Sequence, residues 1–280
     1  MPTFDNPLRK HFRQPAIYVP LPSQGQYWPS GAVVMPSNNE LAVLPMTAID
    51  EITSRTPDAL FNGSAVTEII KSCIPAIRDP WAIPNTDLNT LLVAIRVASY
   101  GHQMSINCQC PNCQAANEFE IDLRLMLDGI RAGDYHVPLR INDLEVRMRP
   151  LSYQEINEAS KFQFEDQKMI QNLGQAELTE EQRSEIINRT FRKIAEFTVR
   201  TVAQSVSSIT FDGQTVTDPD HILDFLTNCD KAVFDQIKNY SLELKTSSDF
   251  RPLEARCTEC ETEFKQEFSL DVSNFFEANS

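Results

Sequence analysis

The sequence predicts an α+β protein with a mainly helical body, short β-hairpins and a zinc-ribbon-like module. Apolar residues recur at helical spacing in several segments between residues 47 and 247. Shorter runs alternate apolar and polar residues around tight turns, which is typical of hairpins. Two Cys-x-x-Cys motifs, Cys110–Cys113 and Cys257–Cys260, lie about 140 residues apart and supply the four thiolates that zinc prefers.

Residues 1–30 are expected to form an extended N-terminal arm. Six prolines in this segment disfavour a helix or a central strand. Aromatic residues stand between them without periodicity, so the arm is expected either to wrap its own domain or to dock on a partner. The residues concerned are Pro2, Pro7, Pro15, Pro20, Pro22, Pro29, Tyr18, Tyr27 and Trp28.

Residues 31–101 are predicted to form a β-hairpin followed by helices. The strands of the hairpin would be 32–35 and 41–44, joined by a turn at Ser37–Asn39. Helical spacing then begins near Thr47, and a helix capped by Asp87 is expected to stop at Gly101. Its apolar face contains Leu88, Leu91, Leu92 and Ile95.

Residues 102–150 and 248–280 are predicted to build the zinc-ribbon-like module together. Strands are expected at 102–107 and 118–125, and a hairpin within 137–149 turns at Asn142 and Asp143. The sequence after the first motif, 119–123, resembles the sequence after the second, 268–272, so both motifs are expected to lead into similar strands.

The segment 151–247 is predicted to be a helical region. Capping boxes Ser152–Glu155 and Thr179–Gln182 would open two helices, with 171–178 as their connection. After a turn at 211–214, a further helix begins with Asp218 as its cap and Pro219 at its first position. The apolar stripe of this last helix consists of Leu226, Val233, Ile237 and Leu244.

Seven cysteines in a chain without a signal-peptide pattern favour thiols or metal ligands over disulfides, because the cytosol is reducing. We predict a structural zinc held by Cys110, Cys113, Cys257 and Cys260, with Cys108 as an alternative to Cys110. The alternatives are reduced cysteines without metal, or a redox pair. Cys73 and Cys229 lie on apolar helix faces and are expected to be small buried hydrophobes.

The residues do not indicate an enzyme. Four thiolates would close the coordination sphere of zinc, and a redox Cys110–Cys113 pair would need a helix starting at the motif, where a strand is expected. With eight glycines the chain contains no phosphate-binding loop. None of the four histidines joins a Ser or Cys in a recognisable catalytic motif: His11, His102, His136 and His221.

The net charge of −14 disfavours nucleic acid as a partner, and no window is long and apolar enough to predict a membrane span. A zinc-ribbon regulator that binds nucleic acid would need a basic face near the cysteines. The residues around them are acidic instead: Glu118, Glu120, Asp122, Glu259, Glu261 and Glu263.

Several segments together resemble the T-even-type phage baseplate protein family, whose members are hub-associated proteins of contractile tails. The segments are Leu21–Tyr27, Leu44–Thr47, Asn89–Gly101, the turn Cys110–Cys113, and the C-terminal Cys257–Cys260 that ends near Phe275 and Phe276. The helix followed directly by the cysteine turn is the most specific of them. The region from about 152 to 247 and the extra Cys108 do not align securely with the family.

The resemblance implies a non-enzymatic structural component of the baseplate that contacts other hub, wedge or tail proteins. It implies no reaction. Together with the charge and hydropathy of the chain, it leads us to expect no nucleic-acid, membrane or small-molecule partner. The expected location is the tail baseplate of the virion, and the host cytoplasm during assembly. The alternative within the same family is an assembly chaperone that is absent from the mature virion.

Overall fold

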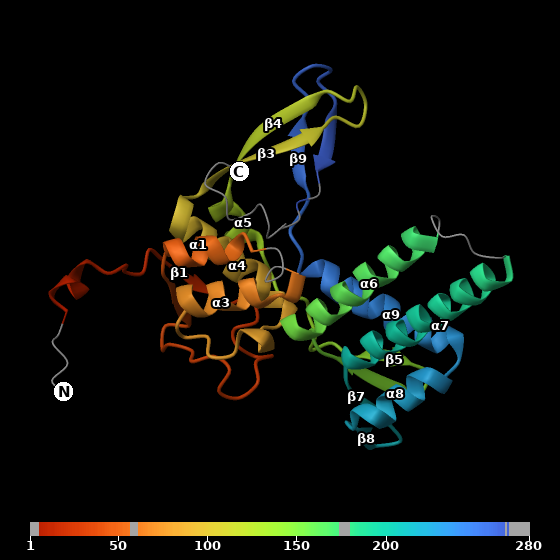
Figure 1. Cartoon of the computed structure of the whole chain (residues 1–280). Coiled ribbons are helices and arrows are strands. Elements are labelled where there is room, and N and C mark those ends of the chain that lie inside the picture. Colours follow the sequence, from red (N-terminus) through yellow and green to blue (C-terminus); the bar gives the residue numbers. More distant parts are fainter. Residues whose placement is uncertain (1–5, 57–60, 174–179, 267, 269–280) are drawn as a thin grey trace. The chain divides into compact units, whose positions relative to one another are not determined.

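The structure, a computed structural model, describes residues 6–56, 61–173, 180–266 and 268. Its helices are α1 Ala48–Ser54, α3 Ser64–Cys73, α4 Asn85–Tyr100, α5 Leu123–Gly129, α6 Tyr153–Leu173, α7 Glu180–Gln204, α8 Pro219–Asn228 and α9 Lys231–Ser247. Its strands are β1 Ile17–Pro20, β2 Glu40–Val43, β3 Gln103–Gln109, β4 Ala116–Asp122, β5 Leu139–Ile141, β6 Leu144–Met148, β7 Val206–Phe211, β8 Gln214–Val216, β9 Leu253–Arg256 and β10 Glu263–Gln266. Figure 1 labels most of these elements.

The α+β class is confirmed, whereas a mainly helical body is not. Helices hold 46% and strands 21% of the described residues, and the strands form four separate small sheets. The chain divides into two compact units. The first unit comprises residues 1–80, 87–130 and 250–280, and the second comprises 81–86 and 131–249.

The core of the first unit is built by the apolar faces of α3 and α4. The helix α3 buries the adjacent Ile69 and Ile70, and α4 buries Leu91 and Ile95, all of them without solvent exposure. A helix that is apolar over most of its surface must be surrounded by other elements, so α4 lies in the interior. It was correctly predicted from its periodicity, although it begins at Asn85, two residues before the expected cap.

The predicted hairpin between residues 32 and 44 is wrong. Strand β2 pairs in antiparallel register with β1, from Ile17 opposite Val43 to Pro20 opposite Glu40. Val33 instead forms a bridge with Ile77. Pro36 lacks the N–H that a hairpin ladder requires, whereas β1 offers β2 a partner over its whole length.

The N-terminal segment beyond residue 12 packs on its own unit. The guanidinium of Arg13 donates to the Pro45 carbonyl at 2.6 Å and to the Ser72 carbonyl and hydroxyl at 2.8 Å each. It also lies 3.3 Å from the carboxylate of Asp50. Of the two roles considered for the arm, wrapping its own domain therefore describes this part of it.

Asp87 fastens the next part of that segment to α4. Its carboxylate accepts hydrogen bonds from the Ser23 amide at 2.9 Å, the Ser23 hydroxyl at 2.5 Å and the Trp28 indole at 2.7 Å. Burial raises the pKa of Asp87, and the hydrogen bonds from Ser23 and Trp28 counteract part of that rise. The predicted helix cap is thus a buried acceptor that holds the turn at residues 21–28.

The second unit contains a four-stranded antiparallel sheet in the order β5-β6-β7-β8. Its first hairpin turns at Asn142 with φ +53° as predicted, but β6 pairs with β7 and not with the strands of the cysteine motifs. The hairpin β7–β8 lies inside the segment expected to be helical. We correct that expectation because the turn at 211–214, which the sequence shows, joins two strands.

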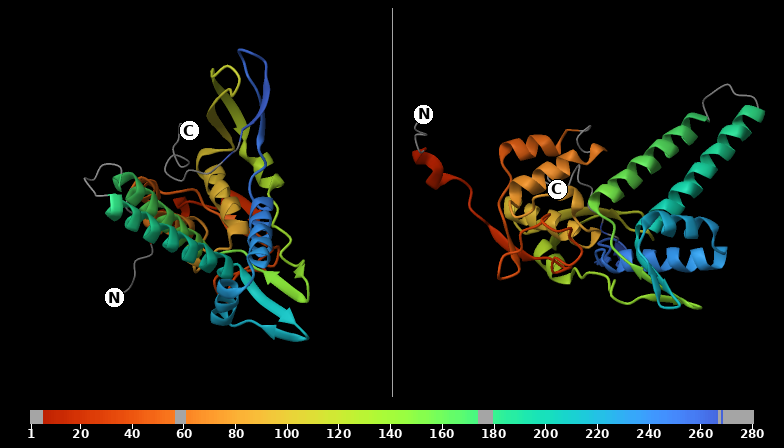
Figure 2. Two further views of the ribbon diagram at one scale, coloured as in Figure 1. Left: turned by 90° about the vertical axis from the view of Figure 1, so that its right-hand side faces the viewer. Right: turned by 90° about the horizontal axis from the view of Figure 1, so that it is seen from below.

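The second unit also contains the helices α6, α7, α8 and α9. The capping box is formed, since the Ser152 amide donates to Glu155 at 2.7 Å and the Glu155 amide to the Ser152 hydroxyl at 3.3 Å. Asp218 caps α8 as predicted. The expected last helix is two helices, because the chain leaves helical geometry at Cys229. Figure 2 shows α6 and α7 from two further directions.

Three further expectations fall wholly or partly outside the described residues. They are the capping box that begins at Thr179, most of the helix connection 171–178, and the strand 268–272 after the second motif. Among the residues that the structure does describe, no helix combines the length and the apolar character that a membrane crossing requires.

Candidate metal centre

The first Cys-x-x-Cys motif forms the tip of the hairpin β3–β4. The Cys110 amide donates to the Ala115 carbonyl at 2.9 Å, and the Gln114 amide donates to the Cys110 carbonyl at 2.9 Å. Gln114 has φ +62°, a left-handed conformation that lets the chain reverse after the second cysteine. This knuckle directs both sulfurs to the same side of the turn.

The second motif has the same backbone geometry at the tip of β9–β10. The Cys257 amide donates to the Thr262 carbonyl and the Glu261 amide to the Cys257 carbonyl, each at 3.0 Å, and Glu261 has φ +57°. Each of these positions is 147 residues after its counterpart in the first knuckle. The two motifs are therefore equivalent knuckles, and Figure 1 shows their hairpins side by side.

The four motif cysteines meet between these hairpins. Cys110 Sγ lies 3.6 Å from Cys260 Sγ, and Cys113 Sγ lies 3.6 Å from Cys257 Sγ. All four sulfurs lie within 4.8 Å of one another. A disulfide bond is about 2.05 Å long, so these are separate thiols. Zinc–sulfur bonds of about 2.3 Å in a tetrahedron place sulfurs about 3.8 Å apart, which matches this arrangement.

Asn117 joins the two hairpins beside the sulfurs and is 3% exposed. Its side-chain oxygen accepts from the Thr258 amide at 2.8 Å and the Thr258 hydroxyl at 3.0 Å. Its amide nitrogen donates to the Ala115 carbonyl at 2.9 Å and lies 3.6 Å from Cys257 Sγ. Sequence reasoning missed this residue, whose only signal is an amide side chain four positions after Cys113.

Two further contacts connect the hairpins near the cluster. The Asn112 side-chain amide lies 3.7 Å from Cys260 Sγ and donates to the Thr262 hydroxyl at 3.2 Å. The rings of Phe119 and Phe264 pack edge to face, with centroids 6.5 Å apart. Phe119 and Phe264 thus form an aromatic contact between the two hairpins.

These contacts favour thiolates at the second knuckle. Hydrogen bonds from the Thr262 side chain and backbone, together with Asn112, lower the pKa of Cys260 to about 5. Backbone hydrogen bonds from Cys260 and Glu259 lower the pKa of Cys257. A backbone hydrogen bond from Ala115 lowers the pKa of Cys113, but hydrogen bonding to Cys260, desolvation and hydrogen bonding to Cys257 and Cys110 together raise that pKa to about 12. Metal ligands are thiolates, so binding of a cation would displace the protons that these cysteines still carry.

The remaining cysteines lie outside the cluster. Cys108 is on β3 and is not among the four sulfurs that could hold a metal, whereas Cys110 is. Cys73 is fully buried on α3, as expected. Cys229 is only half-buried and follows the last residue of α8. Among the described residues, the arrangement is thus one cluster of four thiols that could bind a metal ion.

Comparison with known proteins then places the chain. Residues 34–277 match the family model described as T4 bacteriophage base plate protein. The chain belongs to this family. The matched segment of this T4-type base plate protein includes both knuckles, α4 and the whole of the second unit. No curated protein and no solved structure matches the chain significantly.

Proposed function

We propose that this base plate protein is a hub-associated, non-enzymatic structural subunit of a contractile tail, acting through contacts with other hub, wedge and tail proteins. The observation that carries the proposal is the family match over residues 34–277. The cysteine cluster supports a structural role, because four sulfurs around a metal leave no open position for a substrate.

We further propose that the cluster binds one structural zinc through Cys110, Cys113, Cys257 and Cys260. Two knuckles of the same geometry supply two sulfurs each, at spacings that suit a tetrahedron. Bound there, the metal would join the middle of the chain to its last segment as a zinc-ribbon-like module. This is a means of stabilising two short hairpins that have little apolar core of their own.

The charge around the knuckles supports a protein partner over nucleic acid. The strands and turns at 103–122 and 253–266 hold seven acidic residues against two basic ones, Arg256 and Lys265. Five of the acidic side chains near the cysteines are exposed: Glu118, Glu120, Glu259, Glu261 and Glu263. Such a face repels the phosphate backbone.

The proposal is tested by quantitative mass spectrometry of purified phage particles. We expect this chain at a fixed ratio to the other tail proteins and resistant to removal by high-salt washing. Detection in infected-cell lysate but not in particles would overturn the subunit role and would indicate an assembly chaperone that leaves before the tail is complete.

Replacing Asn117 with Ala should weaken zinc retention without removing any sulfur ligand. The change leaves the Thr258 amide without its acceptor and removes the N–H near Cys257. Loss of such an outer contact typically costs about 10- to 100-fold in metal affinity. Competition of the purified chain with a chromophoric zinc chelator measures this change. Asn107→Ala, a change of an exposed asparagine on the neighbouring strand β3, serves as the control, and equal zinc affinity in both variants would refute the role of Asn117.

A further inference from the structure

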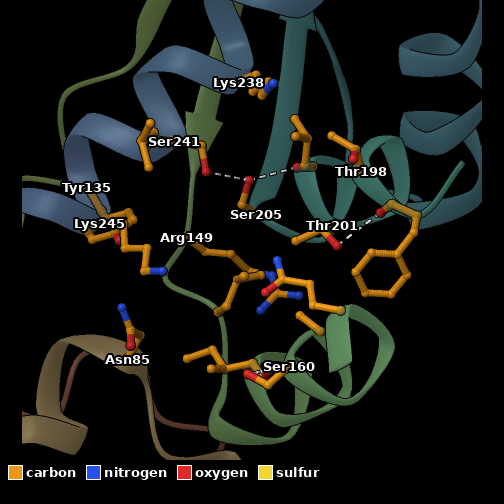
Figure 3. A pocket seen from close by; sticks show the side chains of 17 residues that line it. Asn85, Tyr135, Arg149, Ser160, Thr198, Thr201, Ser205, Lys238, Ser241 and Lys245 are labelled. Atoms are coloured by element: carbon orange, nitrogen blue, oxygen red, sulfur yellow. Dashed lines mark hydrogen bonds between the residues drawn. The ribbon is translucent and has the colours of Figure 1, made fainter. Parts of the chain in front are cut away.

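The second unit contains a half-open cavity of about 370 Å³. It lies between α6, α7 and α9 and the segment that leads from β6 into α6, as Figure 3 shows at close range. Its apolar walls include Ile156, Phe197, Val202 and Leu242. A cavity of this size is in the range that accommodates a small ligand or a few side chains.

The charge of the lining is opposite to that of the chain. Arg149, Lys238 and Lys245 line the cavity, and no Asp or Glu is among the described residues that line it, although the protein has a net charge of −14. The cationic lining therefore favours an acidic occupant.

The three cations differ in what already neutralises them. Arg149 forms two hydrogen bonds to Glu155, at 2.6 and 3.1 Å. Lys238 and Lys245 have no carboxylate within 4.0 Å among the described residues. Burial raises the pKa of Asp249, and the charge of the nearby Lys245 counteracts part of that rise. The two lysines thus carry charge that the surrounding side chains do not fully balance.

The two lysines frame an exposed apolar residue on α9. Lys238, Leu242 and Lys245 follow one another at spacings of four and three residues, which places them on one face of the helix. Leu242 is 59% exposed. This face offers an apolar contact between two cations, which suits a partner with an apolar side chain close to a carboxylate.

The hydroxyl groups in the cavity favour a peptide over a simple anion. Thr198 and Thr201 donate to helix carbonyls at 2.8 and 3.0 Å, and Ser205 donates to the Val202 carbonyl at 2.7 Å. Ser241 donates to Ser205 at 3.0 Å. With their protons committed, the oxygens of Thr198, Thr201 and Ser241 are available as acceptors, whereas the buried Ser205 oxygen already accepts from Ser241. A peptide backbone supplies a series of N–H donors for them, whereas a small carboxylate supplies no donor and a phosphate ion supplies only its one or two O–H groups.

We propose that this cavity receives a segment of a neighbouring baseplate protein in which an Asp or Glu stands beside an apolar residue. The carboxylate would lie between Lys238 and Lys245, the apolar side chain against Leu242 and Phe197, and backbone N–H groups against the hydroxyl oxygens. The inference rests on the proposed role in protein contacts and adds the site and the chemistry of one such contact.

Photocrosslinking tests the proposal directly. The photoreactive residue p-benzoylphenylalanine is placed at position 242 of the full chain in phage-infected cells, and the crosslinked peptides are sequenced by mass spectrometry. We expect a peptide of another tail protein with an Asp or Glu within a few residues of the crosslinked site. A peptide without an acidic residue, or crosslinks that reach no other tail protein, would overturn the proposal.

Charge reversal supplies the matched comparison. Lys238→Glu with Lys245→Glu should reduce the yield of that crosslink roughly tenfold or more, because the carboxylate would face two like charges. Lys231→Glu reverses a lysine on the same helix outside the cavity and should leave the yield unchanged. Thermal melting of each purified variant verifies that it folds. An unchanged yield in the folded double variant would refute the cavity as the site.

This experiment also separates the two proposals. Crosslinking is performed on infected cells, so it detects the contact whether or not the chain remains in finished particles. If the chain is absent from particles but crosslinks to an acidic segment, the subunit role is refuted and the cavity remains a binding site. If the chain is present in particles but does not form that crosslink, the binding site is refuted and the subunit role remains.

Discussion

Replacing Cys113 or Cys260 with Ser is expected to abolish stoichiometric zinc binding and to melt the paired hairpins. The serine hydroxyl remains protonated at neutral pH and cannot replace a thiolate ligand. Structural zinc sites contribute apparent binding energies of roughly 10–16 kcal/mol in small peptides, so loss of the metal is expected to lower the stability of this module by several kcal/mol. Elemental analysis of the purified chain and calorimetric melting, with and without a zinc chelator, measure the effect.

The control for this result is Cys108→Ser. Cys108 lies next to the cluster on β3 but is outside the group of four sulfurs, so the variant should retain one zinc per chain and a melting temperature close to that of the unmodified protein. Zinc loss in this control would mean that Cys108 is a ligand. If neither the chelator nor the Cys113 and Cys260 substitutions change the melting temperature, the proposal of a structural metal is refuted.

Asp87→Ala is expected to destabilise the first unit by roughly 3–5 kcal/mol. The change removes the acceptor of three buried donors, two on Ser23 and one on Trp28, and a buried donor without a partner costs about 1–3 kcal/mol. The turn at 21–28 should then detach from α4. Urea denaturation followed by tryptophan fluorescence measures the loss.

Two comparisons make the result for Asp87 specific. Asp87→Asn retains one acceptor oxygen and should recover part of the lost stability, while its amide group faces donors and prevents full recovery. Glu68→Ala removes an exposed carboxylate from α3 and should change stability by less than about 0.5 kcal/mol. Equal stabilities for the Asp87→Ala and Glu68→Ala variants would contradict the anchoring role.

Local signals in the sequence predicted the helices and the knuckles well. The face of Leu91 and Ile95 identified α4, the pair Ser152 and Glu155 identified the start of α6, and Cys-x-x-Cys spacing identified the four sulfurs that the structure brings together. Each of these signals depends on residues within one or two turns of one another. Such local signals can be read without knowing how the rest of the chain folds.

The errors concern pairings between distant segments. Strand β2 was predicted to pair with the segment around Val33, although its partner β1 lies about twenty residues upstream. Strand β7 was missed because a run such as 206–211 fits a buried helix as well as a strand. Asn117 was also missed because its contact is with a residue far away in the sequence. Its role depends on Thr258, and nothing near Asn117 in the sequence indicates that contact.

The separation of the two knuckles has a consequence for how the protein is made. Cys113 leaves the ribosome 144 residues before Cys257, which at roughly 5–20 residues per second is an interval of about 7–30 s. During that time the whole of 131–249 is synthesised and can fold, while the first knuckle supplies only two of the four sulfurs of the proposed zinc site. A chain that stops early never completes the site. Tight zinc binding would therefore distinguish finished chains from truncated ones before either reaches an assembling tail.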